Sequence, residues 1–243
     1  MKFLILQTLV FSILFSSGVF GQKFLEGNFL FSGKKESYLT LTDGKEIVGF
    51  IDDIDRKKGL IEEITIKEKS TKKKLKLKPE EIKHMYICPS GYDKMNAELS
   101  KIYDVPKWTS EATLNEGYIK EGYSYFESTE VMIKKKKMTL LLQLLNPGFS
   151  KGMKVFFDPY ASETGGVGVG AFGVGDFRLT GGDPKSYYFK KGDDVAFRLY
   201  KKNYDDEWKN LYGNCPKLMS AFKDKMGWSS IENHVYYYSN TCN

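Results

Sequence analysis

The chain has 243 residues, of which 37 are Lys or Arg and 31 are Asp or Glu, and its formal net charge is +6. Hydrophobic residues make up 41% and aromatic residues 15%, which excludes a disordered chain and supports packed cores. The only arginines are Arg56, Arg178 and Arg198. Arginine forms bidentate hydrogen bonds with guanine edges and with phosphates, so this bias toward lysine argues against nucleic-acid recognition.

The first 21 residues have the pattern of a secretory signal peptide. Lys2 precedes an apolar run from Phe3 to Phe15, and small residues at Val19 and Gly21 fit a cleavage site. The run is shorter than the ~20 apolar residues that a transmembrane helix needs. We therefore predict export and cleavage after Gly21, which leaves a mature chain of residues 22–243.

Residues 22–91 carry an all-β pattern. Asp43-Gly44 is a strong hairpin signal between two of five short segments of strand-like residues. Five short strands in so short a stretch predict a small closed β-barrel as the first domain. The Asp43-Gly44 turn followed by Gly49 resembles the Sm-like and SH3-like barrels, and the resemblance covers this segment alone. The five predicted strands span residues 38–41, 47–51, 60–66, 75–77 and 82–87.

The next segment, residues 92–116, has few periodic apolar positions and is predicted to be a linker with a short helix. From residue 117 onward β-prone residues return. Leu140–Leu145 is apolar at nearly every position, so it is predicted to be buried, either as a helix or as a central strand. A strand at residues 155–157 and a hairpin around Lys191-Gly192-Asp193 follow.

The C-terminal residues switch to helical spacing. One apolar stripe starts at Tyr204, a second helix begins at Pro216, and a third includes Ile231, with Ser229 and Glu232 as a capping box. The chain is therefore predicted to be α+β: a small N-terminal β-barrel-like domain, then an antiparallel sheet packed by three C-terminal helices, with the second domain spanning residues 117–243.

Three cysteines are few for a disulfide scaffold, but export would permit one bond. Cys215 and Cys242 bracket the last two predicted helices, and we predict a disulfide between them. Cys88 would then be a buried free thiol. The alternative is that all three are reduced and buried.

Gly168, Gly170 and Gly173 match the dinucleotide-binding pattern G-x-G-x-x-G. That pattern functions where a strand leads into the loop and a helix opens from it, with its N-terminus on the phosphates. The glycine-rich stretch 165–182 offers no such helix. We therefore predict no cofactor.

Gly148-Phe149-Ser150-Lys151-Gly152 matches the nucleophile elbow of α/β-hydrolases. A triad of Ser150, Asp158 or Asp194, and His234 is formally available. The chain lacks the alternation of strands and helices that this scaffold requires, so a serine hydrolase is an alternative rather than the favoured function.

The sequence predicts no metal site. His84 and His234 are the only histidines. Asp52, Asp53 and Asp55 lack the glycine and the distal glutamate of a calcium loop.

Lysines are concentrated in two stretches, residues 67–78 and 134–137. They fit either a patch that docks on anionic lipid or glycan, or edge strands protected from pairing with other chains. No aromatic residues alternate with them as a base-stacking platform requires. The candidate contacts with an anionic surface are Lys72, Lys73, Lys74, Lys76 and Lys78.

Three phrases, "LLQLLNPGFSKGMKVFFDPYASETGG", "GGDPKSYYFKKGD" and "LYGNCPKL", resemble a family of exported, uncharacterised proteins of Bacteroidetes-type bacteria. The members share a signal peptide, an N-terminal β segment with a "DG" hairpin, and a helical tail with a cysteine. The resemblance implies a location in the bacterial envelope and no catalytic residues.

Together these patterns favour a non-catalytic binding or structural protein of the cell envelope, in the periplasm or on the outer-membrane surface. The expected partner is an envelope protein or a glycan that the sequence does not identify. Nucleic acid is not expected as a partner, and peripheral membrane contact through the lysines is the remaining alternative.

Overall fold

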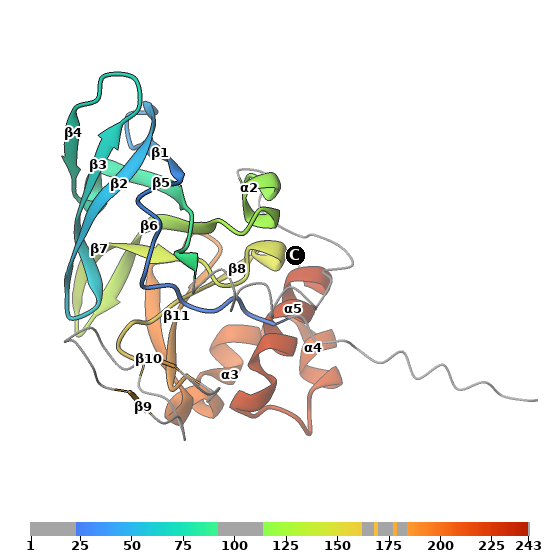
Figure 1. Cartoon of the computed structure of the whole chain (residues 1–243). Coiled ribbons are helices and arrows are strands. Elements are labelled where there is room, and N and C mark those ends of the chain that lie inside the picture. Colours follow the sequence, from blue (N-terminus) through green and yellow to red (C-terminus); the bar gives the residue numbers. More distant parts are fainter. Residues whose placement is uncertain (1–22, 92–113, 162–167, 170–176, 179–183, 243) are drawn as a thin grey trace, which may run out of the picture.

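The computed structural model describes residues 23–91, 114–161 and 184–242, together with the backbone of residues 168–169 and 177–178 (Figure 1). The predicted signal peptide, nearly all of the predicted linker 92–116 and most of the glycine-rich stretch 165–182 lie outside the described residues. Among the described residues, no helix combines the length and the apolar character needed to cross a membrane.

Ten strands form one large sheet in the order β4-β3-β2-β1-β5-β6-β12-β11-β8, and β7 pairs with β6 outside this path. All pairings are antiparallel except that of β12 with β6. The strands are β1 (Glu36–Leu41), β2 (Glu46–Lys57), β3 (Leu60–Glu68), β4 (Lys74–Leu77), β5 (Ile82–Ile87), β6 (Ser124–Ile133), β7 (Lys136–Gln143), β8 (Met153–Phe156), β11 (Ser186–Lys191) and β12 (Ala196–Tyr200). Two short strands, β9 (Gly168–Val169) and β10 (Phe177–Arg178), pair separately.

The five predicted N-terminal strands are confirmed as β1 to β5, but the prediction of a closed barrel is wrong. Closure would require β4 to pair with β5. The second edge of β5 pairs with β6 instead, from His84 opposite Glu127 to Ile87 opposite Ser124. Phe126 of β6 therefore joins the hydrophobic cluster of the first five strands. The division into domains stays a prediction.

Most of the apolar run Leu140–Leu145 lies in strand β7, so its helical alternative is wrong. β7 returns from β6 through a tight turn in which Lys134 and Lys135 have φ angles of 53° and 102°. The lysines at residues 134–137 therefore form the exposed end of a hairpin.

The three predicted C-terminal helices are confirmed as α3 (Tyr204–Tyr212), α4 (Pro216–Ala221) and α5 (Ile231–Thr241). They lie together at one end of the sheet and cover a cluster that includes residues of β8, β11 and β12 (Figure 1). A shorter helix, α2 (Glu116–Lys120), precedes β6. The capping-box prediction is wrong, because a 3-10 turn begins at Trp228 and the Glu232 carboxylate accepts a hydrogen bond from Phe24 N.

Residues 23–32, which we call the N-terminal strap, run from the helices to the first strands (dark blue in Figure 1). Leu25 N donates to the Leu145 carbonyl at 2.7 Å, and Ser32 N donates to the Cys88 carbonyl at 2.9 Å. Phe24 is buried in the cluster beneath the helices, whereas Phe31 packs against the cluster of the first five strands. The strap therefore contacts both hydrophobic clusters.

Buried amides fix the middle of the strap. The Gln143 side chain accepts from Asn28 N at 2.7 Å and donates to the Glu26 carbonyl at 2.9 Å. The Asn28 side chain in turn donates to Ser124 Oγ. These bonds satisfy polar groups that would otherwise be buried without partners.

Asn146 organises the turn between β7 and β8. Its fully buried side chain donates from Nδ2 to the carbonyls of Phe149 at 3.0 Å and Met153 at 2.8 Å, and its Oδ1 accepts from Val155 N at 2.8 Å. The 3-10 turn at Pro147–Phe149 is therefore held by one side chain.

Replacing Asn146 by alanine removes these three bonds and leaves buried backbone groups unsatisfied. We expect the free energy of unfolding to fall by about 3 kcal/mol or more, since each such group costs ~1–3 kcal/mol. Urea denaturation measures the change. Asn240→Ala is the matched control, because the exposed Asn240 amide makes one bond, to the Tyr236 carbonyl. Equal small losses in the two variants would contradict this role of Asn146.

Candidate functional site

Segments far apart in the sequence enclose a groove of about 800 Å³. They are the strap and Gly33 after it, the second half of β2 with the turn that follows, and the residues after β8. This volume is within the ~300–1,000 Å³ typical of small-molecule sites. The lining residues are Phe29, Leu30, Phe31, Gly33, Ile51, Asp52, Asp53, Ile54, Arg56, Lys58, Gly59, Pro159 and Tyr160.

Local distortions of the β2–β3 hairpin shape the wall of the groove that β2 forms. The register between the two strands shifts at Asp52, and again where Arg56 pairs with Ile61. Such bulges redirect side chains and increase the strand twist. At the hairpin turn, Gly59 has φ 81°, and a Cβ there would lie 2.8 Å from the Pro159 Cβ. Glycine therefore lets the hairpin end contact the segment after β8.

The Arg56 guanidinium has few polar partners in the groove. Nη1 donates to the Gly59 carbonyl at 2.9 Å, and the guanidinium lies 5.8 Å from the ring centres of Phe29 and Phe31. Nη2 is buried and has no hydrogen-bond partner among the residues that the structure describes. Burial lowers the pKa of Arg56 to about 10, so the group is still protonated at neutral pH.

Tyr160, on the opposite wall, is held by a buried carboxylate. Asp158 is fully buried, accepts from Tyr160 N at 3.0 Å and from Ser186 Oγ at 2.6 Å, and forms an ion pair with Arg198. The Arg198 guanidinium lies 5.4 Å from the centre of the Tyr160 ring. Tyr160 as a whole stays 39% exposed, so part of its surface is available to a ligand.

Among the acidic residues that line the groove, Asp52 pairs with Lys74 at 2.6 Å. No carboxylate of the described residues forms an ion pair with Arg56. The groove therefore contains a cation without a counter-ion, next to the exposed apolar side chain of Leu30.

Sequence reasoning missed this site. The available signal for Arg56 was that it is an isolated arginine in a lysine-rich chain. The aromatic residues of the strap lie in a segment without recognisable periodicity, so nothing in the sequence placed them beside Arg56.

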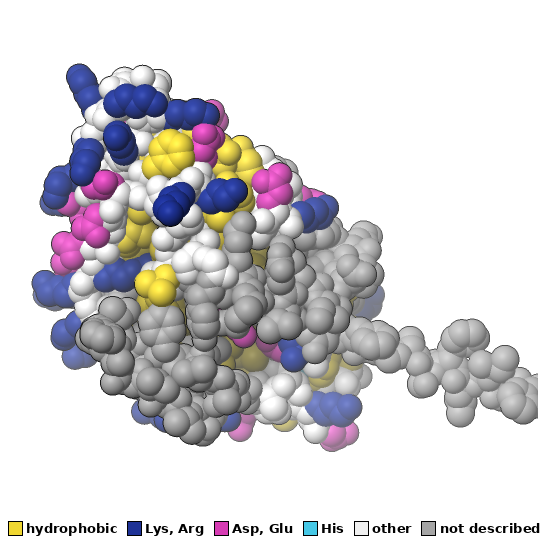
Figure 2. Space-filling model, viewed as in Figure 1, with side chains coloured by type: hydrophobic (Ala, Val, Ile, Leu, Met, Phe, Trp, Pro, Cys, Tyr) yellow, Lys and Arg dark blue, Asp and Glu magenta, His cyan; other side chains and the backbone are white. Residues whose placement is uncertain are grey.

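The predicted lysine contacts lie at and beyond the β3–β4 turn. Lys74 and Lys76 pair with Asp52 and Glu63, at 2.6 and 2.7 Å. Figure 2 shows Asp and Glu side chains between the Lys and Arg side chains over this end of the sheet. Lys72, Lys73 and Lys78 are exposed. Since β4 is an edge strand, its lysines also oppose pairing with other chains. Contact with an anionic surface stays a prediction.

The residues considered for a hydrolase triad do not form one. Ser150 is fully buried and its hydroxyl donates to the Pro147 carbonyl at 3.4 Å. Asp158 is occupied by Ser186 and Arg198. Asp194 lies in the turn between β11 and β12. His234 is hydrogen-bonded at both ring nitrogens to other groups.

His234 closes a chain of buried hydrogen bonds. Nε2 lies 2.8 Å from the Lys225 carbonyl, which can only accept, so Nε2 carries the proton. Nδ1 then accepts from the Tyr204 hydroxyl at 2.7 Å, and that oxygen accepts from Tyr212 at 3.1 Å. This histidine is a structural residue of the helical cluster.

The described residues contain no group of three or more His, Cys, Asp or Glu side chains that could hold a metal ion. His84 lies half-buried on β5, beside the rings of Tyr86 and Tyr125. Of the dinucleotide-pattern glycines, Gly168 begins β9, and Gly170 and Gly173 lie outside the described residues.

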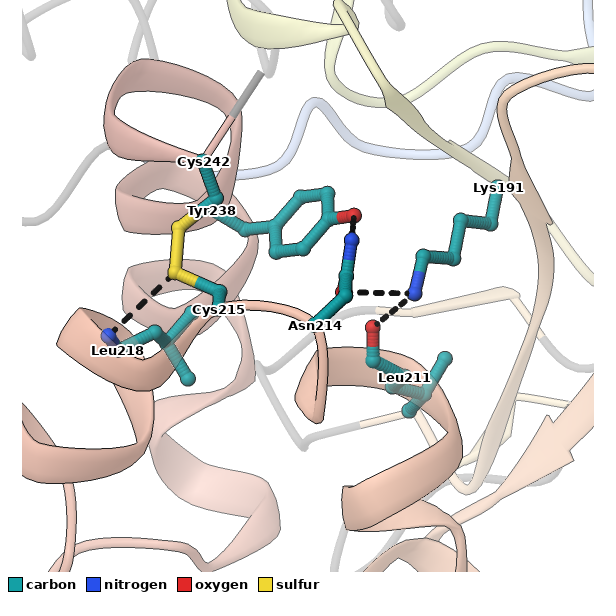
Figure 3. Close-up of a disulfide and its surroundings, with 7 residues drawn as sticks. All are labelled: Lys191, Leu211, Asn214, Cys215, Leu218, Tyr238 and Cys242. Atoms are coloured by element: carbon teal, nitrogen blue, oxygen red, sulfur yellow. Dashed lines mark hydrogen bonds between the residues drawn. A yellow bond between two sulfur atoms is a disulfide. The ribbon is translucent and has the colours of Figure 1, made fainter.

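Cys215 and Cys242 form a disulfide with a Cα–Cα distance of 5.6 Å, as the sequence predicted (Figure 3). It joins the start of α4 to the end of α5, and Cys88 is free and buried. Figure 3 also shows Lys191 Nζ donating to the Leu211 carbonyl at 2.9 Å and to Asn214 Oδ1 at 2.9 Å. β11 is thereby linked to the end of α3.

Comparison with protein-family models, curated proteins and solved structures finds no significant match to this chain.

The buried His234 should make stability depend on pH. Burial lowers its pKa from 6.5 to about 4, so the unfolded chain binds a proton more readily between these values. Neutral His234 therefore makes its full contribution to the free energy of unfolding above pH 6.5. The free energy of unfolding falls by about 3 kcal/mol as the pH drops toward 4. Urea unfolding at several pH values measures the slope.

His234→Gln should flatten the pH dependence of stability, and His84→Gln should leave most of it. If His84→Gln removed the slope and His234→Gln kept it, the assignment to His234 would be wrong.

Proposed function

We propose that this chain is an exported, non-catalytic binding protein of a bacterial cell envelope. The observation that carries the proposal is the groove, which presents exposed apolar walls and an arginine that has a buried Nη2 and no counter-ion among the described residues. A folded protein gains nothing from such an uncompensated cation, since its desolvation is unfavourable. Charged groups that burial perturbs in this way are concentrated at functional sites.

Export is supported by two features at opposite ends of the chain. The N-terminal pattern is that of a signal peptide. The Cys215–Cys242 disulfide fits an oxidising compartment, where such bonds persist.

The non-catalytic assignment is supported by how the candidate catalytic groups are used. Ser150, Asp158 and His234 each donate or accept bonds that hold turns, strands or helices. Breaking these contacts for chemistry would leave buried polar groups without partners in three separate parts of the fold.

The test is to express the full chain in a Bacteroidetes-type bacterium and to measure its intact mass after cell fractionation. We expect envelope material that begins at Gln22, with one disulfide and one free thiol. A chain that retains Met1 and remains in the cytosol would contradict the proposal.

A leader variant provides the control. Leu9→Lys with Phe11→Lys breaks the apolar run and should hold the full-length chain inside the cell. Lys2→Arg, which keeps the positive charge, should still be exported. Equal export of both variants would mean that the leader does not direct the protein.

A further inference from the structure

The charged side chain of Arg56 determines which ligand charge the groove can match. The Arg56 guanidinium has five N–H donors, and within the described part of the chain only Nη1 forms a hydrogen bond, to the Gly59 carbonyl. The two hydrogens on Nη2 have no acceptor. A carboxylate is the natural partner, because charge-assisted bonds to guanidinium are about twice as strong as neutral ones.

The acidic residues of the groove limit the charge of that ligand. Asp53 and Lys58 also line the groove and offset each other, and Asp52 pairs with Lys74, so Arg56 leaves one positive charge. A phosphate dianion would be repelled by Asp53 more strongly than a carboxylate with one charge. The groove therefore favours a monoanion.

The remaining walls require an apolar body. Leu30 is 42% exposed and Tyr160 is 39% exposed, and both border the groove. Phe29, Phe31 and Ile54 supply further apolar surface. Covering this surface removes it from water, at ~25 cal/mol per Å².

We propose that the groove binds the carboxylate of an apolar acid, with Arg56 holding the carboxylate and Tyr160, Leu30 and the strap phenylalanines covering the apolar part. This inference rests on the proposed function and names its ligand class. The acid is either a free fatty acid or the C-terminal residue of an apolar peptide. Because Nη2 is buried, the ligand must shift a groove side chain, a rotamer change that is common on binding.

The experiment is isothermal titration calorimetry of the full chain, with its disulfide intact, against decanoate below its micelle concentration. Decanol tests the need for charge, and decyl phosphate tests the preference for a monoanion. A tetrapeptide ending in phenylalanine and its C-terminal amide test the peptide source. We expect decanoate or the peptide acid to bind about tenfold or more tightly than its neutral analogue.

Arg56→Met should weaken binding of the acid by about tenfold or more and leave the binding of decanol unchanged. Lys57→Met is the matched control, because it removes the same charge from the next residue, which does not line the groove. Circular dichroism checks that both variants fold. Tyr160→Ser, at an exposed site, should weaken decanoate and decanol binding equally and gives a second readout should Arg56→Met unfold.

Tighter binding of decanoate identifies a fatty acid, and tighter binding of the peptide acid identifies a chain terminus, so either supports the proposal. Absence of binding of both acids, equal binding of acid and neutral analogue, or preference for decyl phosphate would overturn it. So would loss of binding in Lys57→Met equal to that in Arg56→Met. Because titration uses purified protein, its failure is distinct from a failure of export.

Discussion

The packing of the N-terminal strap across two hydrophobic clusters is the constraint on which the rest of the structure depends. Phe24 stacks at 6.1 Å from Phe149 and meets Tyr187 edge-on at 5.3 Å, within the cluster under the helices. Phe31 meets Phe126 edge-on at 5.6 Å, in the cluster of the first five strands. The strap thus joins clusters formed by distant parts of the chain. It also supplies one wall of the groove, so the site depends on the strap's position.

Local patterns in the sequence predicted most strands and helices correctly. The spacing of apolar residues, every second residue in a strand or every third to fourth in a helix, depends on which face of that one segment is buried. The strands β1 to β5, the hairpin β11–β12, the helices α3 to α5 and the Cys215–Cys242 bond all follow from such patterns. The prediction of a closed barrel was wrong, because the second neighbour of β5 is β6 rather than β4. Pairing between segments so far apart in the sequence leaves no local pattern. The capping box at Ser229 failed for the same reason, since Glu232 bonds to the strap.

The groove could not be predicted, because its parts carry no local signal. Arg56 lies on a bulged strand whose register depends on its partner, and Tyr160 is placed by the buried Asp158 and Arg198. Of the motifs that suggested a chemical function, Ser150 ends the 3-10 turn at Pro147–Phe149. The turn that Asn146 holds has a sequence that matches the motif of a nucleophile elbow. Only the flanking strands and helices distinguish the two structures.

Hydrogen exchange of individual amides tests the role of the strap most directly. If the strap is part of the cooperative core, the amides of Leu25, Asn28 and Ser32 should exchange only on global unfolding, as slowly as those at the centre of β6. The exposed amide of Lys45, bonded to the Asp43 side chain, should exchange much faster and serves as the internal reference. Fast exchange along the strap beside a protected sheet would mean that it detaches on its own and does not join the two clusters.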